Sequence, residues 1–327
     1  MSFTISGGVQ ITGGGIVISP GGASPTPGGG SFQGSNYGYT SGGATPTFTD
    51  TIDKFSFASD SNATDVGNLT RDARECAGQS SSSHGYASGG INVDLSLMDV
   101  IDKFPFSSDS NATDSGDLTV GKWKVQGQSS ASHGYLTGGY NRTPSANIFT
   151  NEINKFPFAS DGNATDSGDL SENKYGPAGQ SSADNGYASG GNLGPAASSM
   201  IEKFPFASDG NATDVGDLTL DRYNASGQSS STNGYTSAGV DIPTGPTNII
   251  DKFPFSSDSN ATDVGDLIEG RQNSAGQSST ASGYSSGGQP SAIDMGRIEK
   301  FPFASDSNAT DVGDLFEARL GGAGQQY

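Results

Sequence analysis

The sequence has one cysteine, two histidines and few basic residues, and each shortage excludes a class of protein. The single Cys76 cannot form an intrachain disulfide or a multi-cysteine metal site, so stability has to come from packing. The 16 Lys and Arg residues face 35 Asp and Glu residues, and a formal charge of −19 repels phosphate backbones and anionic membranes. We therefore expect no nucleic-acid partner. We also expect no membrane insertion, because no apolar run approaches 18 residues.

Glycine, by contrast, is abundant, with 50 Gly and 15 Pro among the 327 residues. Gly costs about 1 kcal/mol at a helix position, so a mainly helical fold is excluded. The aromatic residues argue against disorder, because twelve of the 17 Phe and six of the 11 Tyr stand at fixed places in a recurring motif. The sequence therefore predicts a folded, all-β repeat protein.

Three landmarks recur six times along the chain, which is the signature of a repeat architecture. The first is Gly-Tyr before a small-Gly pair, with its tyrosines at Tyr39, Tyr86, Tyr135, Tyr187, Tyr235 and Tyr284. The second is Ile-x-Lys-Phe-Pro-Phe, which begins at Ile52, Ile101, Ile153, Ile201, Ile250 and Ile298, with Ser56 in place of the first Pro. The third is Asp-x-Asn-Ala-Thr-Asp-x-Gly-Asp-Leu, which begins at Asp60, Asp109, Asp161, Asp209, Asp258 and Asp306, with Asn68 in place of the last Asp in the first copy. A Gly-Gln pair also precedes a Ser-rich stretch at Gly78, Gly127, Gly179, Gly227 and Gly276.

Each repeat thus offers four short extended segments separated by turn residues, which is typical of one β-propeller blade. Alternation places Phe55 and Phe57 on one side of the third segment and Ile52 on the other, so the Phe pair is predicted to fill the space between blades. The Pro between the two Phe residues removes a ladder donor and is predicted at a strand end or bulge.

The two termini indicate how the repeats close. No Gly-Gln segment precedes the first Gly-Tyr, whereas the chain ends with Gly324-Gln325-Gln326-Tyr327. We therefore predict an all-β, six-bladed β-propeller over residues 34–327, closed by a C-terminal strand that completes the first blade. A Gly-rich arm and tether over residues 1–33 precedes it.

The order of these segments resembles the kelch repeat over about residues 34–327. The basic position of that repeat is matched by Lys122, Lys174, Arg222, Arg271 and Arg319, each five residues before the Gly of Gly-Gln or its C-terminal equivalent. The chain departs from the kelch pattern at the fourth strand, where kelch repeats usually carry Trp. The Lys-Phe-Pro-Phe and Asn-Ala-Thr-Asp strings are also similar to repeats in structural proteins of marine bacteriophages.

The phage resemblance implies a virion protein, such as a capsid fibre, knob or tail appendage, that contacts the host and sits on the particle surface. No Lys or Arg precedes Lys54, so a Sec-type signal peptide is not expected and release by lysis fits. Two rival interpretations remain, an intracellular kelch adaptor and a propeller enzyme. His84 and His133 cannot complete a three-ligand metal site, and no nucleophile triad is present, so we expect no enzyme, no catalytic or metal site and no cofactor.

Two further patterns have structural interpretations beside the functional ones. The Asp-x-Asn-Ala-Thr-Asp string alternates oxygen ligands as calcium loops do, but it lacks the Gly and Glu of an EF-hand, so side-chain-capped turns are favoured and calcium stays open. The same Asn-Ala-Thr is a glycosylation sequon, which is not favoured without a secretory signal. The Lys of each Lys-Phe-Pro-Phe is expected to pair with an Asp of its own repeat.

The connectors between the conserved-looking segments divide into two kinds. The Ser-rich and Asp-Ser-Asn connectors barely change, whereas those after the small-Gly pair and after the fourth segment differ in length and content. Because strands alternate in direction, the varied connectors are predicted to share one face, which binds a host glycan or surface protein. The predicted partner-binding residues are Phe48, Trp123, Tyr140, Arg142, Phe149, Tyr175 and Tyr223. The alternative is drift in unconstrained loops.

The N-terminal arm alternates β-prone triplets with glycines and cannot bury a core alone. We predict that it anchors the protein to other virion proteins by strand addition. The predicted anchoring residues are Phe3, Ile5, Val9, Ile11, Ile16 and Ile18. The alternative is a disordered tail without function.

Overall fold

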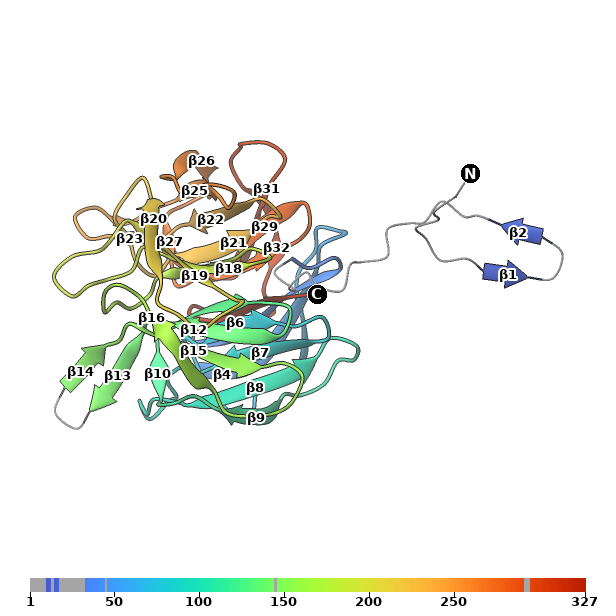
Figure 1. The fold of residues 1–327 in the computed structure, drawn as a ribbon, viewed down its shortest axis with the longest axis horizontal. Coiled ribbons are helices and arrows are strands. Elements are labelled where there is room, and N and C mark those ends of the chain that lie inside the picture. Colours follow the sequence, from blue (N-terminus) through green and yellow to red (C-terminus); the bar gives the residue numbers. More distant parts are fainter. Residues whose placement is uncertain (1–9, 13–14, 18–32, 45, 144–145, 291–294) are drawn as a thin grey trace, which may run out of the picture.

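The computed structural model describes residues 10–12, 15–17, 33–44, 46–143, 146–290 and 295–327. All regular structure in these ranges is β-strand, and the strands pair antiparallel (Figure 1). No stretch of these ranges forms a helix long and apolar enough to cross a membrane.

Most of the strands form six antiparallel sheets of four strands, one for each repeat. Sheet 1 contains β33 (Ala323–Gln326), β3 (Tyr37–Ala44), β4 (Phe48–Ser56) and β5 (Thr64–Asn68). Sheet 2 contains β6 (Ala77–Ser80), β7 (His84–Ser88), β8 (Val100–Pro105) and β9 (Thr113–Asp117). Sheet 3 contains β11 (Gln126–Ser129), β12 (His133–Thr137), β15 (Glu152–Pro157) and β16 (Thr165–Asp169).

The other three sheets follow the same order of strands. Sheet 4 contains β17 (Ala178–Ser181), β18 (Asn185–Ser189), β19 (Met200–Pro205) and β20 (Thr213–Asp217). Sheet 5 contains β21 (Ser226–Ser229), β22 (Asn233–Ser237), β25 (Ile249–Pro254) and β26 (Thr262–Asp266). Sheet 6 contains β28 (Ala275–Ser278), β29 (Ser282–Ser286), β31 (Arg297–Pro302) and β32 (Thr310–Asp314).

Short strands form in the connectors between these sheets. The connectors of sheet 3 pair as β10 (Lys122–Trp123), β13 (Tyr140–Thr143) and β14 (Ala146–Phe149), and Figure 1 shows the β13–β14 hairpin projecting from the body. Two-stranded pairs are β23 (Val240–Asp241) with β24 (Gly245–Pro246), β27 (Arg271–Gln272) with β30 (Gln289–Pro290), and β1 (Gln10–Thr12) with β2 (Gly15–Val17).

The C-terminal strand joins the start of the body, as the two termini predict. β33 pairs with β3, with Gln325 opposite Tyr39, and the backbone N–H of Tyr327 donates to the carbonyl oxygen of Tyr37 at 2.8 Å. β33 also contacts β28 of sheet 6 and β6 of sheet 2. Sheet 1 is therefore built from both ends of the described body.

In the five repeats that have it, the motif proline ends the third strand, which confirms its predicted place at a strand end. Pro205 is the last residue of β19, one position after Phe204. The irregularity of the ladder lies at the other end of the motif, where the register shifts between Ile201 and Glu202. A proline at the strand end leaves the rest of the ladder intact, because no interior N–H is lost.

The two Phe residues of each sheet pack on the tyrosine of the preceding sheet, as predicted for a filler between sheets. Phe204 and Phe206 of sheet 4 lie 5.5 and 4.8 Å, centroid to centroid, from Tyr135 of sheet 3. Phe55 and Phe57 of sheet 1 contact Tyr284 of sheet 6 in the same way. Each buried Phe contributes about 1.5–3 kcal/mol, so these contacts are a main source of stability.

The first strands approach one another so closely that only glycine fits at one position of each. β6, β11, β17, β21, β28 and β33 contact each other in this order, and β33 again contacts β6. A Cβ on Gly227 would overlap the carbonyl oxygen of Gly179 in the preceding first strand. The next residue reaches the other way: Gln228 Nε2 donates to the carbonyl oxygen of Tyr284 in sheet 6 at 3.0 Å. The Gly-Gln pair is thus explained by contacts between sheets.

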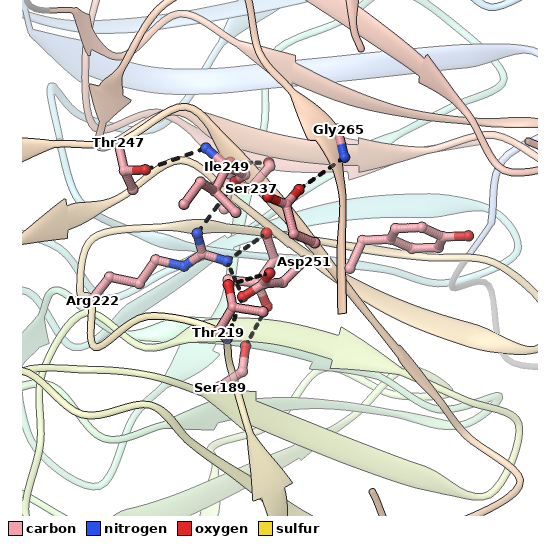
Figure 2. Close-up of polar contacts among 12 residues, drawn as sticks. Ser189, Thr219, Arg222, Ser237, Thr247, Ile249, Asp251 and Gly265 are labelled. Atoms are coloured by element: carbon pink, nitrogen blue, oxygen red, sulfur yellow. Dashed lines mark hydrogen bonds and ion pairs between the residues drawn. The ribbon is translucent and has the colours of Figure 1, made fainter. Parts of the chain in front are cut away.

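Buried ion pairs join a basic residue that precedes the first strand of a sheet to an acidic residue of its third strand. In sheet 5 the guanidinium of Arg222 lies 2.9 Å from the carboxylate of Asp251, and both side chains are fully buried (Figure 2). Thr219 donates its backbone N–H and its hydroxyl to the same carboxylate, at 2.9 and 2.7 Å. Equivalent buried pairs are Lys174 with Glu202, Arg271 with Glu299, and Arg319 with Asp53.

Sheet 2 lacks the cation of this arrangement. Ala73 occupies the position of Arg222, yet the acidic partner remains as Asp102, which is 3% exposed. Asp102 accepts hydrogen bonds from the backbone N–H and hydroxyl of Thr70 at 3.1 and 2.7 Å. Burial raises the pKa of Asp102, and the hydrogen bonds from Thr70 only partly oppose that shift.

The prediction that each motif lysine pairs within its own repeat is wrong. Lys54 lies 2.5 Å from Asp109 of the next repeat, and Lys300 reaches Asp60 of the first at 2.5 Å. The reason is that each acidic string lies against the preceding sheet: Asn62 Oδ1 accepts the backbone N–H of Asp314 at 3.2 Å. All six lysines pair in this way, with Asp109, Asp161, Asp209, Asp258, Asp306 and Asp60.

The acidic string itself forms the side-chain-capped turn that was favoured for it. In each copy an Asp carboxylate accepts the N–H of the Gly two residues later, as Asp214 does from Gly216 at 3.0 Å. The Asn of each string accepts a backbone N–H from the preceding sheet, as Asn260 Oδ1 does from Asp217 at 3.1 Å. Contacts within and between sheets thus account for the string.

Of the N-terminal arm, the structure describes only a small part. Ile11 and Ile16 lie opposite each other in the β1–β2 pair, while Phe3, Ile5, Val9 and Ile18 lie outside the described residues. The anchoring role of these residues stays a prediction.

Candidate functional site

The structure places the two kinds of connector at opposite ends of the sheets. We define the varied face as two sets of connectors. One set joins the second and third strands of each sheet, and the other leads from a fourth strand to the next sheet. The repeated face carries the Ser-rich turns and the acidic strings. In each sheet a residue from one kind of varied connector bridges a residue from the other, as Tyr175 does with Asn192 and Tyr223 with Val240. The varied connectors are therefore in contact, as their topology predicts.

Five of the seven predicted partner-binding residues form one aromatic cluster on this face. Tyr140 stacks between Trp123 and Tyr175, with ring centroids 5.4 and 4.4 Å away. Phe149 stands edge-on to Tyr140 at 4.8 Å, and Tyr223 contacts Tyr175 at 5.7 Å. All five side chains are half-buried, so the cluster supports the β13–β14 hairpin as well as presenting surface.

Phe48, another of the predicted residues, lies outside the cluster. Phe48 contacts the guanidinium of Arg74 at 4.8 Å and belongs to sheet 1. Arg142 lies on β13, and its side chain is outside the described part of the structure. Lys124, which the sequence analysis did not single out, joins the cluster, because its ammonium lies 5.3 Å from the ring centre of Trp123 and 5.0 Å from that of Tyr175.

Lys124 also belongs to a ring of six residues that the sequence analysis missed, here called the mouth ring. Its members are Glu75, Lys124, Gly176, Asn224, Asn273 and Gly321, each three residues before the Gly that the first strands share. Each donates its backbone N–H to the carbonyl oxygen of the member before it, at 2.5–3.1 Å, and the hydrogen bonds return from Gly321 to Glu75. All six have positive φ, between 54° and 71°.

Two members of the mouth ring are residue types that rarely adopt the positive φ of their position. Gly and Asn tolerate positive φ, and they occupy four of the six places. Glu75 and Lys124 adopt φ of 56° and 54° in the other two, at a cost on the order of 1–3 kcal/mol each. The Gly and Asn residues at this spacing are the signal that could have revealed the ring in the sequence.

The mouth ring surrounds a small cavity. A volume of about 30 Å³ is lined by Glu75, Lys124, Asn224 and Asn273 among others. A second cavity of about 60 Å³ between the first strands shares Cys76 and Gln126 with it, so the two adjoin. Cys76 is a buried free thiol.

Glu75 is the most unusual group at this cavity. Its Oε2 is buried and has no hydrogen-bond partner in the structure, although buried carboxylate oxygens are normally paired. Burial raises the pKa of Glu75, and the charges of Lys124 and Arg74 oppose that shift only partly. Burial likewise lowers the pKa of Lys124, against the attraction of Glu75.

Large apolar side chains are exposed mainly on the varied face. Among the described residues eight such side chains are exposed, and six of them lie in varied connectors. These are Val93, Leu95, Ile148, Ile242, Ile268 and Phe316, with Val93 66% and Phe316 60% exposed. The remaining two, Tyr37 and Tyr327, lie where β3 meets the C-terminus. The varied face is thus the more apolar end of the body.

The two histidines and the acidic residues are not gathered into a metal-binding group in the described part of the chain. No group of three or more His, Cys, Asp or Glu in the described ranges is placed to hold a metal ion. His84 and His133 lie on the repeated face, where each ring nitrogen Nδ1 contacts the hydroxyl of the preceding serine at 2.8 Å. Burial lowers the pKa of both histidines, and Lys103 or Lys155 lowers it further.

No protein-family model matches the chain, and no curated protein matches it either. The functional interpretation therefore depends on the geometry of the two faces.

Proposed function

We propose that this chain is a non-enzymatic adhesion protein of a bacteriophage particle, built as a six-bladed, kelch-like β-propeller. In this proposal the varied face binds the host surface, and the N-terminal arm holds the protein on the particle as part of a fibre, knob or tail appendage. The gathering of exposed apolar side chains on the varied face is the observation that carries the binding role.

Several contacts support the propeller. The first strands contact one another in sequence order, and β33 contacts both β28 and β6. The Lys–Asp pairs continue from sheet 6 to sheet 1 through Lys300 and Asp60, and the hydrogen bonds of the mouth ring return to their first residue. A closed array of six four-stranded blades accounts for all three.

The place where the arm reaches the body supports the division of roles. Gly34 donates its backbone N–H to the carbonyl oxygen of Ser278 at 2.7 Å, and Gln33 Nε2 donates to that of Ser279 at 3.1 Å. Both partners lie in a Ser-rich turn of the repeated face. Figure 1 likewise draws the C-terminus and the β13–β14 hairpin at opposite sides of the body. An arm that leaves the repeated face directs the varied face away from the particle.

The test is a charge placed on each face in turn. The double variant I242D/F316D changes two exposed side chains of the varied face, and A131D changes an exposed residue in a Ser-rich turn of the repeated face. Binding of the fluorescently labelled protein to host cells should fall at least tenfold in I242D/F316D and stay unchanged in A131D. Equal binding by all three proteins, or loss only in A131D, would overturn the proposal.

A further inference from the structure

The mouth ring has an internal order that suits a ligand laid across it. The charged pair Glu75 and Lys124 is adjacent in the ring, and the amide pair Asn224 and Asn273 is adjacent on the opposite side. Gly176 and Gly321 separate the two pairs and contribute no side chains. Side chains of neighbouring members reach over both glycines, since a Cβ on Gly176 would overlap Asn224 Oδ1 and one on Gly321 would lie 3.0 Å from Glu75 Cγ. A charged edge therefore faces an amide edge across the mouth.

The chemistry of the four side chains restricts what such a ligand can be. The buried Oε2 of Glu75 has no partner and calls for a hydrogen-bond donor. Lys124 lies beside it and disfavours a cationic donor, while the Asn amides both donate and accept. The cavity holds about 30 Å³, which admits one hydroxyl or hydroxymethyl group rather than a whole ring.

Three aromatic residues are next to members of the mouth ring in the chain. Trp123, Tyr175 and Tyr223 each precede a ring member in the chain, and all three are half-buried. Aromatic faces and edges offer apolar surface to the C–H groups of a flat ligand whose rim is polar. Uncharged hydroxyl donors, hydroxyl acceptors and an apolar ring face occur together in saccharides.

We propose that the mouth ring is a saccharide-binding subsite in which Glu75 accepts hydrogen bonds from sugar hydroxyls. The inference rests on the proposed function and deepens it, because it assigns a glycan as the host-surface partner and places one sugar over the cavity. The half-buried Asn273 binds a further hydroxyl from the opposite side, whereas Asn224 is buried and donates its Nδ2 to Gln272 Oε1 at 3.3 Å. The aromatic cluster contacts the adjoining part of the glycan. In this proposal the strained Glu75, whose Oε2 has no hydrogen-bond partner, serves this contact rather than stability.

The variant E75Q distinguishes a ligand-binding role of Glu75 from a structural role. Glutamine keeps the size of the side chain but replaces the acceptor oxygen with an amide that donates. Because burial already raises the pKa of Glu75, its charge opposes folding at neutral pH, so E75Q should melt at the same or a higher temperature. A purely structural role for the carboxylate would instead lower the melting temperature. The matched control is E317Q, which changes an exposed glutamate in another varied connector.

The probes are an array of bacterial surface polysaccharides and a panel of neutral hexoses and N-acetylhexosamines used as inhibitors, all with the full-length chain. We expect the wild type and E317Q to bind at least one polysaccharide, and E75Q to bind it at least tenfold more weakly. Unchanged binding by E75Q would overturn the inference. It would also be overturned if the wild type bound host cells but no polysaccharide, an outcome that leaves the proposed function standing and indicates a protein receptor. Failure to bind host cells at all would instead remove the proposed function.

Discussion

The two ends of this molecule differ in how far their residues repeat. Contacts between neighbouring sheets use the same residue types in every repeat, such as the Gly-Gln pair, the capping Asn and the Lys–Asp pair. The connectors of the varied face share little beyond the positive φ of the mouth ring. Stability thus depends on the repeated contacts, together with the mouth ring and the buried cations that precede the first strands, and the repeats differ mainly in the rest of the varied face.

Removal of the C-terminal strand should have the largest effect on the repeated contacts. Deleting residues 323–327 takes away β33 and, with it, the hydrogen bonds of Gln325 to Tyr86 and Ser41. We expect a loss comparable to the whole folding free energy, about 5–15 kcal/mol, measured as loss of the cooperative melt in circular dichroism. A chain that begins at residue 33 should melt like the full protein, and a cooperative melt after the C-terminal deletion would contradict the role given to β33.

Breaking a buried ion pair should have the next largest effect. In D251N the guanidinium of Arg222 stays buried without its carboxylate, which costs about 3–5 kcal/mol. Urea unfolding of the variant and the wild type measures this difference. The guanidinium also donates to the carbonyl oxygens of Ile249 and Thr236, at 3.3 and 3.0 Å. A cost below about 1 kcal/mol would mean that these carbonyl oxygens suffice to hold the buried cation without the carboxylate.

The same substitution in sheet 2 should act in the opposite direction. Ala73 provides no cation there, so D102N removes a buried charge without leaving one behind, and Thr70 can keep both hydrogen bonds by turning its hydroxyl. We expect a gain of about 1 kcal/mol at pH 7, because burial disfavours the charged form of this carboxyl.

The pH dependence of that gain follows from the raised pKa of Asp102. A carboxyl whose pKa is higher in the folded than in the unfolded state favours folding at low pH, and this contribution is lost as the pH rises through the folded-state pKa. The gain from D102N should therefore shrink between pH 7 and pH 4 in thermal melts. A gain that is constant across this range would show that charge is not its source.

The exposed Lys–Asp pairs should contribute least. Lys203 lies 2.5 Å from Asp258, but the carboxylate is 62% exposed, so K203M should cost about 0.2–1 kcal/mol. Because salt screens such pairs, the cost should fall further between 0.05 and about 0.5 M NaCl. A cost above about 2 kcal/mol, unaffected by salt, would indicate that the pair holds the sheets together more strongly than its exposure implies.

Most of the fold could be predicted from the sequence because its landmarks recur at a fixed spacing. The four strands of each repeat, the proline at the end of the third strand and the pairing of β33 with β3 all follow from that recurrence. The partner of each lysine could not be predicted, because Lys54 reaches Asp109 only once the acidic string lies against the preceding sheet. Contacts between sheets depend on how the sheets face each other, which a single repeat does not specify.

The candidate site was predictable only in part. The aromatic residue types indicated a surface, but their stacking around Tyr140 required the hairpin to form. The mouth ring was missed because Glu75 and Lys124 interrupt its Gly and Asn pattern with charged residues. Glu75 and Lys124 adopt a positive φ that their residue types disfavour, and the saccharide subsite is proposed at these two residues.

The central claim is that the varied face, and not the repeated face, meets the host. Hydrogen exchange of the full-length chain, free and bound to isolated host envelopes, tests it most directly. We predict that binding slows exchange in the connectors over residues 140–143, 146–152 and 240–249 and leaves the Ser-rich turns unchanged. Protection confined to the Ser-rich turns, with no change in the varied connectors, would contradict the claim.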